Sequence, residues 1–396
     1  MISTREIFLR NLGQTSPSPM GLEIKKALGV KLIDINNKDY FDLISGVSVA
    51  NLGHSNPVIT EAVKKQVDKY LHVMVYGEFI EEPQVELAKL LSEVLPDSLS
   101  TTYLVNSGSE AVEGAMKLAK RYTGRFEIIS FKNAYHGSTH GAMSLMSDKY
   151  FTNAFRPLLP GIKYLDFNDI DSLQNITFKT AAVFIEPVQG EAGIISPVND
   201  FLKRLRDRCN KTETLLVFDE IQTGFGRTGE LFAYKKYDVI PDILLLAKAL
   251  GGGMPIGAFC SSKSIMDSFM TNPVLGHITT FGGHPASAAA AAAGLKYLIL
   301  NPEIVESVYE KELLFKEQLI PLKNIKEIRH NGLYMAVDFK NTQILFKALP
   351  LLQDAGIHTD WFLFDDQSFR IAPPLTITKE EVLEASKRII FALQNL

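Results

Sequence analysis

Cysteine and net charge are both scarce in this sequence. The only cysteines are Cys209 and Cys260, which excludes a disulfide framework and a cysteine-rich zinc site and favours the reducing environment of the cytoplasm. Lys and Arg number 41 against 45 Asp and Glu, a net charge of −4, so no basic surface for nucleic acid is expected.

Long apolar runs are absent as well. No stretch approaches the ~20 consecutive apolar residues that a helix needs to cross a bilayer, so no membrane partner is expected. Residues 1–12 lack the apolar centre of a secretory signal. The 396 residues, 46% of them hydrophobic, are typical of a globular protein of two to three domains at about 150 residues each.

Between about residues 100 and 260, short apolar runs alternate with polar or glycine-rich turns and helical stretches. The apolar runs predict strands at Tyr103–Val105, Ile128–Phe131, Ala181–Ile185, Leu215–Phe218, Ile243–Leu246 and Gly257–Cys260. Continuous runs of this kind are typical of strands buried on both faces. We therefore expect an α/β fold with a mostly parallel sheet and helices on either side.

The flanking regions have a different pattern. Lys31–Leu43 alternates in a way that predicts a small antiparallel meander, and an alanine-rich helix is expected after Pro285. Residues 300–396 mix helical stretches with short strands such as Tyr334–Phe339 and Phe369–Ala372. This mixture predicts a second, smaller α+β domain.

Polar side chains follow the predicted strands at five places. They are Ser107–Ser109, Tyr135–His136, Glu186, Asp219 and Lys248. Open α/β sheets bind ligands at the carboxyl ends of their strands, so these five groups are expected to converge on one crevice.

Asn106–Glu110 predicts a helix start that binds phosphate. Ser107 and Glu110 have capping-box spacing, and Gly108 allows a tight turn that leaves free N–H groups at the positive end of the helix. The alternative is a well-capped helix without a ligand.

Asp219 ends a very apolar strand, where an ionised carboxylate needs a cation or hydrogen-bond donors. A protonated ring nitrogen of a cofactor would satisfy it. The alternatives are that Asp219 caps the following turn or pairs with a structural arginine. The next residues, 222–229, offer no histidine or third oxygen ligand, so no metal is expected.

Lys248 follows the apolar run 243–247 and precedes the glycines of 251–253. Burial lowers the pKa of a lysine, and the neutral amine can attack a carbonyl to form a Schiff base. The alternative is a lysine that reaches the surface at a strand end.

His136 and His140 are four residues apart, but Gly137 and Gly141 interrupt a helix there and no acidic ligand accompanies them. A metal site is therefore not expected. Tyr135 and His136 instead suit a stacking face and a hydrogen-bond donor for a flat ring.

A phosphate loop, a ring-facing aromatic, a buried acid and a Schiff-base lysine, in this order, are the parts of a pyridoxal phosphate enzyme. The sequence resembles the class III (ω-amino) aminotransferases of the fold-type I superfamily, over nearly the whole chain. The motifs that carry the resemblance are Asn51–His54, Asn106–Glu113, Ala134–Gly137, Glu186–Glu191, Phe218–Gly224, Ala247–Lys248, Thr280–Gly283 and Arg370–Pro374.

The resemblance implies a large cofactor-binding domain over residues 51–284. The smaller domain is expected to combine residues 1–50 with residues 285–396. The resemblance also implies a homodimer with active sites at its interface, because Thr280 is similar to a threonine that reaches the phosphate of the neighbouring subunit.

Several residue roles follow from the resemblance. Lys248 would bind pyridoxal 5'-phosphate covalently and later move the proton, and Asp219 would keep the ring nitrogen protonated. Tyr135 and Ile221 would contact the two ring faces. The residues implied to bind the cofactor are Ser107, Gly108, Ser109, Tyr135, His136, Glu186, Asp219, Ile221, Gln222, Lys248 and Thr280.

The implied substrate-binding residues are Glu191, Arg370, Ser138 and Thr279. In the family, the glutamate neutralises the arginine when an ω-amine is bound, and the arginine is freed to hold the carboxylate of 2-oxoglutarate. Relatives that act on ornithine or acetylornithine usually have an arginine at the position of Ser138, and ornithine relatives a tyrosine at Val47. Three stretches, 155–161, 246–253 and 278–281, are similar to putrescine aminotransferases.

The sequence therefore predicts an enzyme that moves a terminal amino group from an ω-amino donor to 2-oxoglutarate. The donor would be of the ornithine, acetylornithine, putrescine or 4-aminobutyrate type. An aminomutase or racemase of the same fold is the alternative enzyme, and a non-catalytic binding protein is the third hypothesis. Glu191 with Arg370 favours transfer, while Lys248 and Asp219 argue against a non-catalytic protein.

Overall fold

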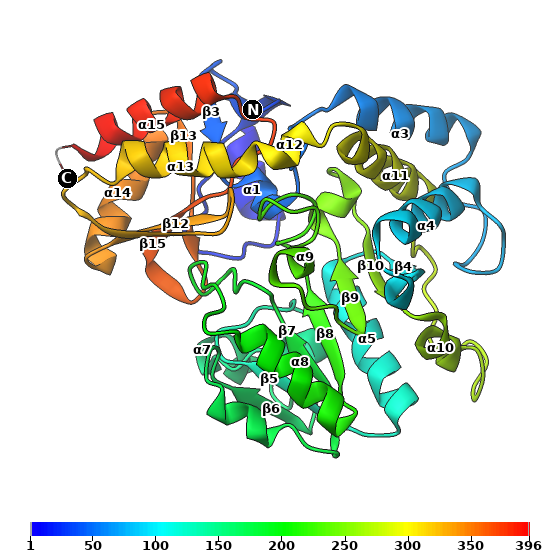
Figure 1. Ribbon diagram of the computed structural model, residues 1–396. Helices are drawn as coiled ribbons and strands as arrows, with labels where there is room; N and C mark the ends of the chain where they lie inside the picture. Colours follow the sequence, from blue (N-terminus) through cyan, green and yellow to red (C-terminus); the bar gives the residue numbers. More distant parts are fainter. Residues whose placement is uncertain (1, 395) are drawn as a thin grey trace.

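A seven-stranded sheet forms the centre of the larger part of the molecule in the computed structural model, which describes residues 2–394 and 396 (Figure 1). Its strands, in spatial order, are β4 (Thr101–Val105), β10 (Gly257–Ser261), β9 (Ile243–Leu246), β8 (Leu215–Asp219), β7 (Thr180–Ile185), β5 (Glu127–Phe131) and β6 (Ile162–Leu165). Strands β9, β8, β7, β5 and β6 pair in parallel, and β10 is antiparallel to both of its neighbours. The predicted α/β fold with a mostly parallel sheet is therefore confirmed.

All six predicted strands are present, and their ends differ from the expected ones by two residues at most. β5, β7, β8, β9 and β10 are buried along their whole length, which is why their sequences are mostly apolar. β6 was not predicted, because it lies at the sheet edge and only Leu165 is fully buried.

Successive residues of β8 enter two different cores. Leu215 and Val217 pack on the face covered by α5, while Leu216 and Phe218 pack on the face covered by α8. The helices of the larger part are α3 (Pro57–Lys69), α4 (Glu82–Val94), α5 (Gly108–Thr123), α6 (His140–Met143), α7 (Lys149–Thr152), α8 (Phe201–Thr212), α9 (Ala233–Tyr237), α10 (Lys263–Met266) and α11 (Pro285–Leu300).

The alanine-rich helix α11 begins at Pro285, as expected. The expected domain limit at residue 284 would place this helix in the C-terminal domain. In the structure α11 packs against α3 and α4, and its buried alanines and leucines join the core of the larger part. Alanine side chains let these helices approach closely, and the polypeptide passes to the smaller part only after Leu300.

The smaller part contains two four-stranded sheets, and both chain ends lie in it (Figure 1). One sheet has the order β1 (Ile24–Leu28), β2 (Lys31–Asp34), β3 (Asp39–Asp42), β13 (Ile357–His358), and the other has the order β11 (Ile325–His330), β12 (Met335–Phe339), β15 (Asp365–Ile371), β14 (Trp361–Phe362). The helices are α1 (Thr4–Asn11), α2 (Ser45–Ser48), α12 (Glu303–Glu306), α13 (Val308–Leu319), α14 (Thr342–Asp354) and α15 (Lys379–Leu393).

The predicted antiparallel meander corresponds to β2 and β3, which β1 extends by one strand. β3 then pairs in parallel with β13, so the beginning and the end of the chain share one sheet. Val30, Phe41 and Leu43 accordingly belong to the same core as the side chains of α13, α14 and α15. Residues 1 and 395 of the expected domain ranges lie outside the described residues.

Arg227 links three segments of the chain and is completely buried. Its Nη1 donates to the carbonyl oxygens of Leu333 and Pro373, at 2.7 Å each. Its Nη2 donates to Ser45 Oγ at 3.2 Å and to Asn51 Oδ1 at 2.6 Å. Arg227 therefore joins the larger part to both the N-terminal and the C-terminal contributions to the smaller part.

Within residues 2–394 and 396, no helix is long and apolar enough to cross a membrane. The same residues contain no group of three or more His, Cys, Asp or Glu side chains placed to hold a metal ion.

Candidate active site

A cavity of about 430 Å³ lies at the carboxyl ends of the parallel strands. It is lined by residues that follow β4, β5, β7, β8 and β9, because the ends of parallel strands meet at one edge of the sheet. Ten of the eleven residues expected to bind the cofactor line it: Ser107, Gly108, Ser109, Tyr135, His136, Glu186, Asp219, Ile221, Gln222 and Lys248. Thr280 does not, and its side chain is exposed.

The cavity meets the N-terminus of the sixteen-residue helix α5. Ser107 is the N-cap and its Oγ accepts from Glu110 N at 3.2 Å. The expected capping box is only half formed, since Glu110 Oε2 accepts from the backbone N and the Nδ2 of Asn106, both at 2.8 Å, instead of from Ser107 N. A Cβ at Gly108 would come within 2.8 Å of Ile221 Cδ1, so a larger residue there would require the Ile221 side chain to move.

Asp219 is paired with His136 inside the protein. Asp219 Oδ2 lies 2.7 Å from His136 Nδ1, and Asp219 Oδ1 accepts from Ile221 N at 3.1 Å. Burial lowers the pKa of His136, but the hydrogen bond and the charge of Asp219 outweigh it and raise the pKa overall. The expected alternative of a structural arginine is wrong for Asp219, whereas the turn-capping role is present.

His136 and His140 contact different groups. His136 contacts Asp219, while His140 Nε2 lies 3.0 Å from the carbonyl oxygen of Phe155. Sequence inspection did not find the His136–Asp219 pair, because 83 positions separate its members and only the meeting of two strand ends brings them together.

Glu186 supports the loop that carries Tyr135. Its Oε1 accepts from Tyr135 N at 3.0 Å and its Oε2 from Gly190 N at 2.9 Å. Burial raises the pKa of Glu186 to about 7, with a further rise from Asp219 and an opposing effect of His136.

Lys248 lies two residues after the apolar strand β9, at the start of a short 3-10 turn, and lines the cavity. Its backbone is in the left-handed region with φ 49°, which is uncommon for a residue with a side chain and typical of functional sites. Burial lowers the pKa of Lys248 to about 8, while the charge of Glu191 opposes this change. The neutral fraction of the amine near neutral pH is therefore larger than that of an ordinary lysine.

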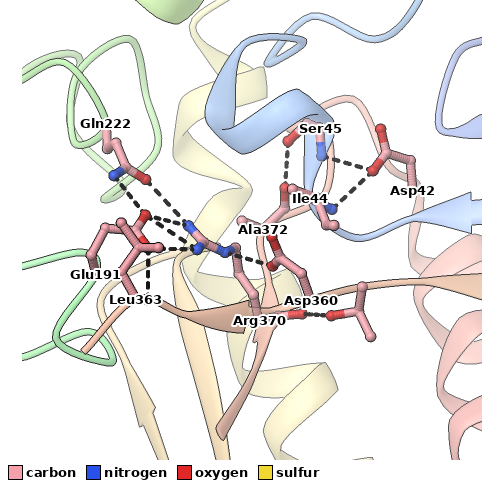
Figure 2. A network of polar contacts seen from close by, with 10 residues as sticks. Asp42, Ile44, Ser45, Glu191, Gln222, Asp360, Leu363, Arg370 and Ala372 are labelled. Carbon is pink, nitrogen blue, oxygen red and sulfur yellow. Dashed lines mark hydrogen bonds and ion pairs between the residues drawn. The ribbon is translucent and has the colours of Figure 1, made fainter. Parts of the chain in front are cut away.

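A second polar cluster surrounds Arg370 of β15 (Figure 2). Arg370 Nη1 and Nη2 each donate to Glu191 Oε1 at 3.2 Å, and Nη2 donates to Glu191 Oε2 at 3.1 Å. Arg370 Nε donates to Asp360 Oδ1 at 3.0 Å, and the guanidinium lies 4.5 Å from the ring centre of Phe362. Sequence inspection missed Asp360 and Phe362, whose positions carry no motif.

Gln222 connects this cluster to the cavity (Figure 2). Its Nε2 donates to Glu191 Oε1 at 3.2 Å, and its Oε1 accepts from Arg370 Nη1 at 3.4 Å. Burial raises the pKa of Glu191, but the charge and hydrogen bonds of Arg370 outweigh it, so the pKa is lowered overall. The pair is therefore ionised and held out of water beside the cavity.

Ser138 and Thr279 lie apart from the Arg370 cluster. Ser138 is exposed, and its Oγ is 3.0 Å from Tyr135 Oη. Thr279 Oγ1 accepts from Asn106 Nδ2 at 3.0 Å, which ties residues 278–281 to the loop before α5.

Residues 13–393 match the family model described as Aminotransferase class-III. The chain belongs to the class III aminotransferase family. It is 39% identical over 376 residues to an acetylornithine aminotransferase of Clostridium acetobutylicum, covering 91% of this chain and 93% of the relative. It is 38% identical to a putrescine aminotransferase of Pectobacterium atrosepticum, covering 92% and 81%.

The fold of this class III aminotransferase is similar to that of the ornithine aminotransferase from Toxoplasma gondii. The TM-score is 0.90 at 30% identity, over 98% of this chain and 92% of the other, and that structure holds pyridoxal phosphate at its active site. The predicted family, the transaminase class and the predicted cofactor, pyridoxal 5'-phosphate, are thereby confirmed.

The residues around the cavity of this class III aminotransferase fit pyridoxal phosphate. The start of α5 suits a phosphate, because the first N–H groups of a helix have no partner within it and Ser107, Gly108 and Ser109 line the cavity. A carboxylate and an amine with a lowered pKa, those of Asp219 and Lys248, line the same cavity. This combination provides partners for an anion, a protonated ring nitrogen and an aldehyde.

Proposed function

We propose that this class III aminotransferase transfers a terminal amino group from an ω-amino donor to 2-oxoglutarate, giving an aldehyde and glutamate. The donor is of the ornithine, acetylornithine, putrescine or 4-aminobutyrate type. The observation that carries the proposal is the buried pair of Arg370 and Glu191, which Gln222 connects to the cavity.

The proposed cofactor contacts follow the lining of the cavity. Ser107, Gly108 and Ser109 bind the phosphate at the start of α5, and Tyr135 and Ile221 contact the ring. Asp219, oriented by His136 and by Ile221 N, holds a proton on the ring nitrogen. Glu186 holds the loop of Tyr135 by accepting a hydrogen bond from Tyr135 N, and Gln222 donates near the phenolic oxygen of the cofactor.

Pyridoxal phosphate, when bound, supplies an electron sink for the carbon that loses its proton. Lys248 binds the cofactor through its neutral amine and, once released by substrate, accepts and returns that proton. A lysine with a pKa near 8 can carry out both actions close to neutral pH.

The acceptor is proposed to bind through Arg370. A guanidinium holds a carboxylate with two parallel hydrogen bonds, as Arg370 now holds Glu191. When 2-oxoglutarate binds, Glu191 moves away from Arg370, and the carboxylate of the acceptor takes over its hydrogen bonds with the guanidinium. With an amine that lacks a carboxylate, Glu191 stays and neutralises the arginine.

The donor side favours an amine without a carboxylate at the Ser138 end. Ser138 offers a hydroxyl where a donor's α-carboxylate would need a cation, and Lys248 is the only lysine or arginine among the described residues that line the cavity. We therefore expect putrescine or another diamine to compete well with ornithine.

The proposed assembly is a homodimer in which Thr280 reaches the partner's phosphate and Thr279 borders the substrate. Large apolar side chains are exposed around Thr280 and on the segment before α4, which supports a covered surface there. These side chains are Leu71, Val73, Met74, Phe79, Ile80, Met270, Val274, Leu275, Ile278 and Phe281.

A panel of amines offered with 2-oxoglutarate tests the proposal through glutamate formation. Putrescine, ornithine, acetylornithine, 4-aminobutyrate and lysine should be compared by kcat/KM. A diamine at least equal to ornithine is expected. If ornithine or acetylornithine exceeds every diamine by orders of magnitude, the donor assignment is wrong, and if 2-oxoglutarate accepts no amino group, the acceptor assignment is wrong.

A further inference from the structure

Tyr334 precedes β12 and its hydroxyl is an unused hydrogen-bond donor. The residue is completely buried, and its Oη has no hydrogen-bond partner among residues 2–394 and 396. Buried hydroxyls without a partner cost free energy, so each one in a folded protein calls for an explanation. Burial also holds the pKa of Tyr334 well above its usual value, so the hydroxyl keeps its proton.

The sheet register places Tyr334 beside Arg370. Ala336 of β12 is paired with Arg370 of β15, and Tyr334 lies two residues before Ala336, on the same face. Diagonal neighbours of this kind are within reach of an aromatic side chain. Tyr334 also shares a small apolar cluster with Phe362, on whose ring Arg370 lies.

The hydroxyl itself points at the residue before Glu191. A side chain at Gly190 would collide with Tyr334 Oη, and the same added Cβ would lie 3.1 Å from Gln222 Nε2. The phenol therefore meets the backbone next to Glu191, on the side where Gln222 already donates to that glutamate.

While Glu191 is paired with Arg370, its carboxylate needs no further hydrogen-bond donor. Its two oxygens accept from both Nη atoms of Arg370, from Gln222 Nε2 and from Leu363 N (Figure 2). When a substrate carboxylate takes Arg370, Glu191 loses the arginine's hydrogen bonds while it is still deep in the protein. An ionised carboxylate in that position requires a new donor.

We propose that Tyr334 is a positioning residue for the carboxylate exchange: its hydroxyl donates to Glu191 once Arg370 has been taken by the acceptor. The inference rests on the proposed function, because it assumes that the acceptor's carboxylate binds Arg370. Tyr334 then favours the state that holds a dicarboxylate and contributes nothing when an amine is bound.

The test compares the holoenzyme with Tyr334→Phe, with exposed Tyr150→Phe as a matched control. Binding of glutarate, an unreactive dicarboxylate, is measured by calorimetry, and the two half-reactions are followed separately by single-turnover absorbance. Tyr334→Phe should weaken glutarate and raise the KM for 2-oxoglutarate about 10-fold, the size expected for a hydrogen bond to a charged group. The putrescine half-reaction should stay within twofold of wild type, and Tm should not fall, because a partnerless hydroxyl has been removed.

A double-mutant cycle separates this role from general packing. In a Glu191→Gln background the displaced side chain carries no charge, so Tyr334→Phe should change glutarate affinity less than twofold. The proposal is overturned if Tyr334→Phe leaves glutarate binding unchanged, slows both half-reactions equally, or weakens glutarate equally in the Glu191→Gln background.

Arg370→Ala distinguishes a failure of the role proposed for Tyr334 from a failure of the proposed acceptor site. If Arg370→Ala abolishes glutarate binding while Tyr334→Phe does not affect it, the role of Tyr334 is wrong and the proposed function stands. If Arg370→Ala leaves glutarate binding intact, the proposed acceptor site fails and the role of Tyr334 fails with it.

Discussion

Arg370 Nη2 lies 3.1 Å from Glu191 Oε2, and both side chains are almost completely buried. Removing Arg370 from this pair should impair binding of the substrate that the arginine is proposed to hold, 2-oxoglutarate. Arg370→Ala should slow the half-reaction with 2-oxoglutarate about 10- to 100-fold, in line with ~1.5 to 3 kcal/mol for hydrogen bonds to a charged group. The half-reaction with a diamine should change far less, and exposed Arg204→Ala should change neither. Equal slowing of both half-reactions in single-turnover experiments would contradict this role.

Lys248→Ala should abolish turnover and leave a folded protein. Among the described residues that line the cavity, the variant loses the only lysine, but it keeps the phosphate and ring contacts, so it should still bind pyridoxal phosphate without a covalent bond. Steady-state rates and the visible absorbance of the purified variant check both statements, with exposed Lys263→Ala as control. Normal turnover in Lys248→Ala would remove the central catalytic assignment.

Asp219→Asn should lower activity severely, because an amide cannot keep a ring nitrogen protonated. The substitution also removes the charge that raises the pKa of His136, so that pKa should fall. Turnover reports the first effect, and NMR titration of His136 reports the second. Asp238→Asn, at an exposed carboxylate, provides the control. Activity within a few-fold of wild type would be incompatible with the role of Asp219.

Ser138→Arg should change donor preference. A guanidinium at this exposed position near Tyr135 would supply the cation that a donor's α-carboxylate lacks in the wild type. We expect kcat/KM for ornithine relative to putrescine to rise about 10-fold, again from a charged hydrogen bond. Ser138→Ala should leave the ratio nearly unchanged. An unaltered ratio in Ser138→Arg would show that the α-carboxylate does not reach residue 138.

The pKa of Lys248 predicts a pH dependence for cofactor uptake. Burial lowers this pKa to about 8, and covalent attachment needs the neutral amine, so uptake should be slow below pH 8 and should accelerate as pH rises through it. The rate at which apoenzyme gains visible absorbance with added pyridoxal phosphate measures this. Glu191 raises the pKa of Lys248, so Glu191→Gln should move the midpoint to lower pH. A midpoint near the ordinary lysine value of about 10.5 would contradict the assignment.

Much of the fold and most of the cavity lining could be predicted from sequence, for one physical reason. Strands buried on both faces are continuously apolar, and the residue after such a strand lies at the ligand-binding edge of the sheet. Asp219 and Lys248 were found in this way. The edge strand β6 escaped because its outer residues face solvent.

Partners within the site could not be predicted, because no local pattern records them. His136 contacts Asp219 only because the segment after β5 and the end of β8 lie at the same edge of the sheet, and Asp360, which contacts Arg370, lies in the short connection between β13 and β14. The position of α11 was misjudged for a related reason. A helix of alanines has no distinct apolar face, so its sequence does not show which core it joins.

The pairing of β3 with β13 also determines when this enzyme can finish folding during its synthesis. Phe41 leaves the ribosome long before its strand partner Ile357 is synthesised. The hydrogen bond from Ser45 to Ala372 spans 327 positions. The hydrogen bonds of Arg227 to the carbonyl oxygens of Leu333 and Pro373 can form only after those residues have been synthesised. The seven-stranded sheet is complete in sequence at Ser261, so it can form first, while β1–β3 remain an open edge. The nascent chain therefore exposes an unpaired edge of β3 until β13 has been made, and chaperones that cover such edges should bind it there.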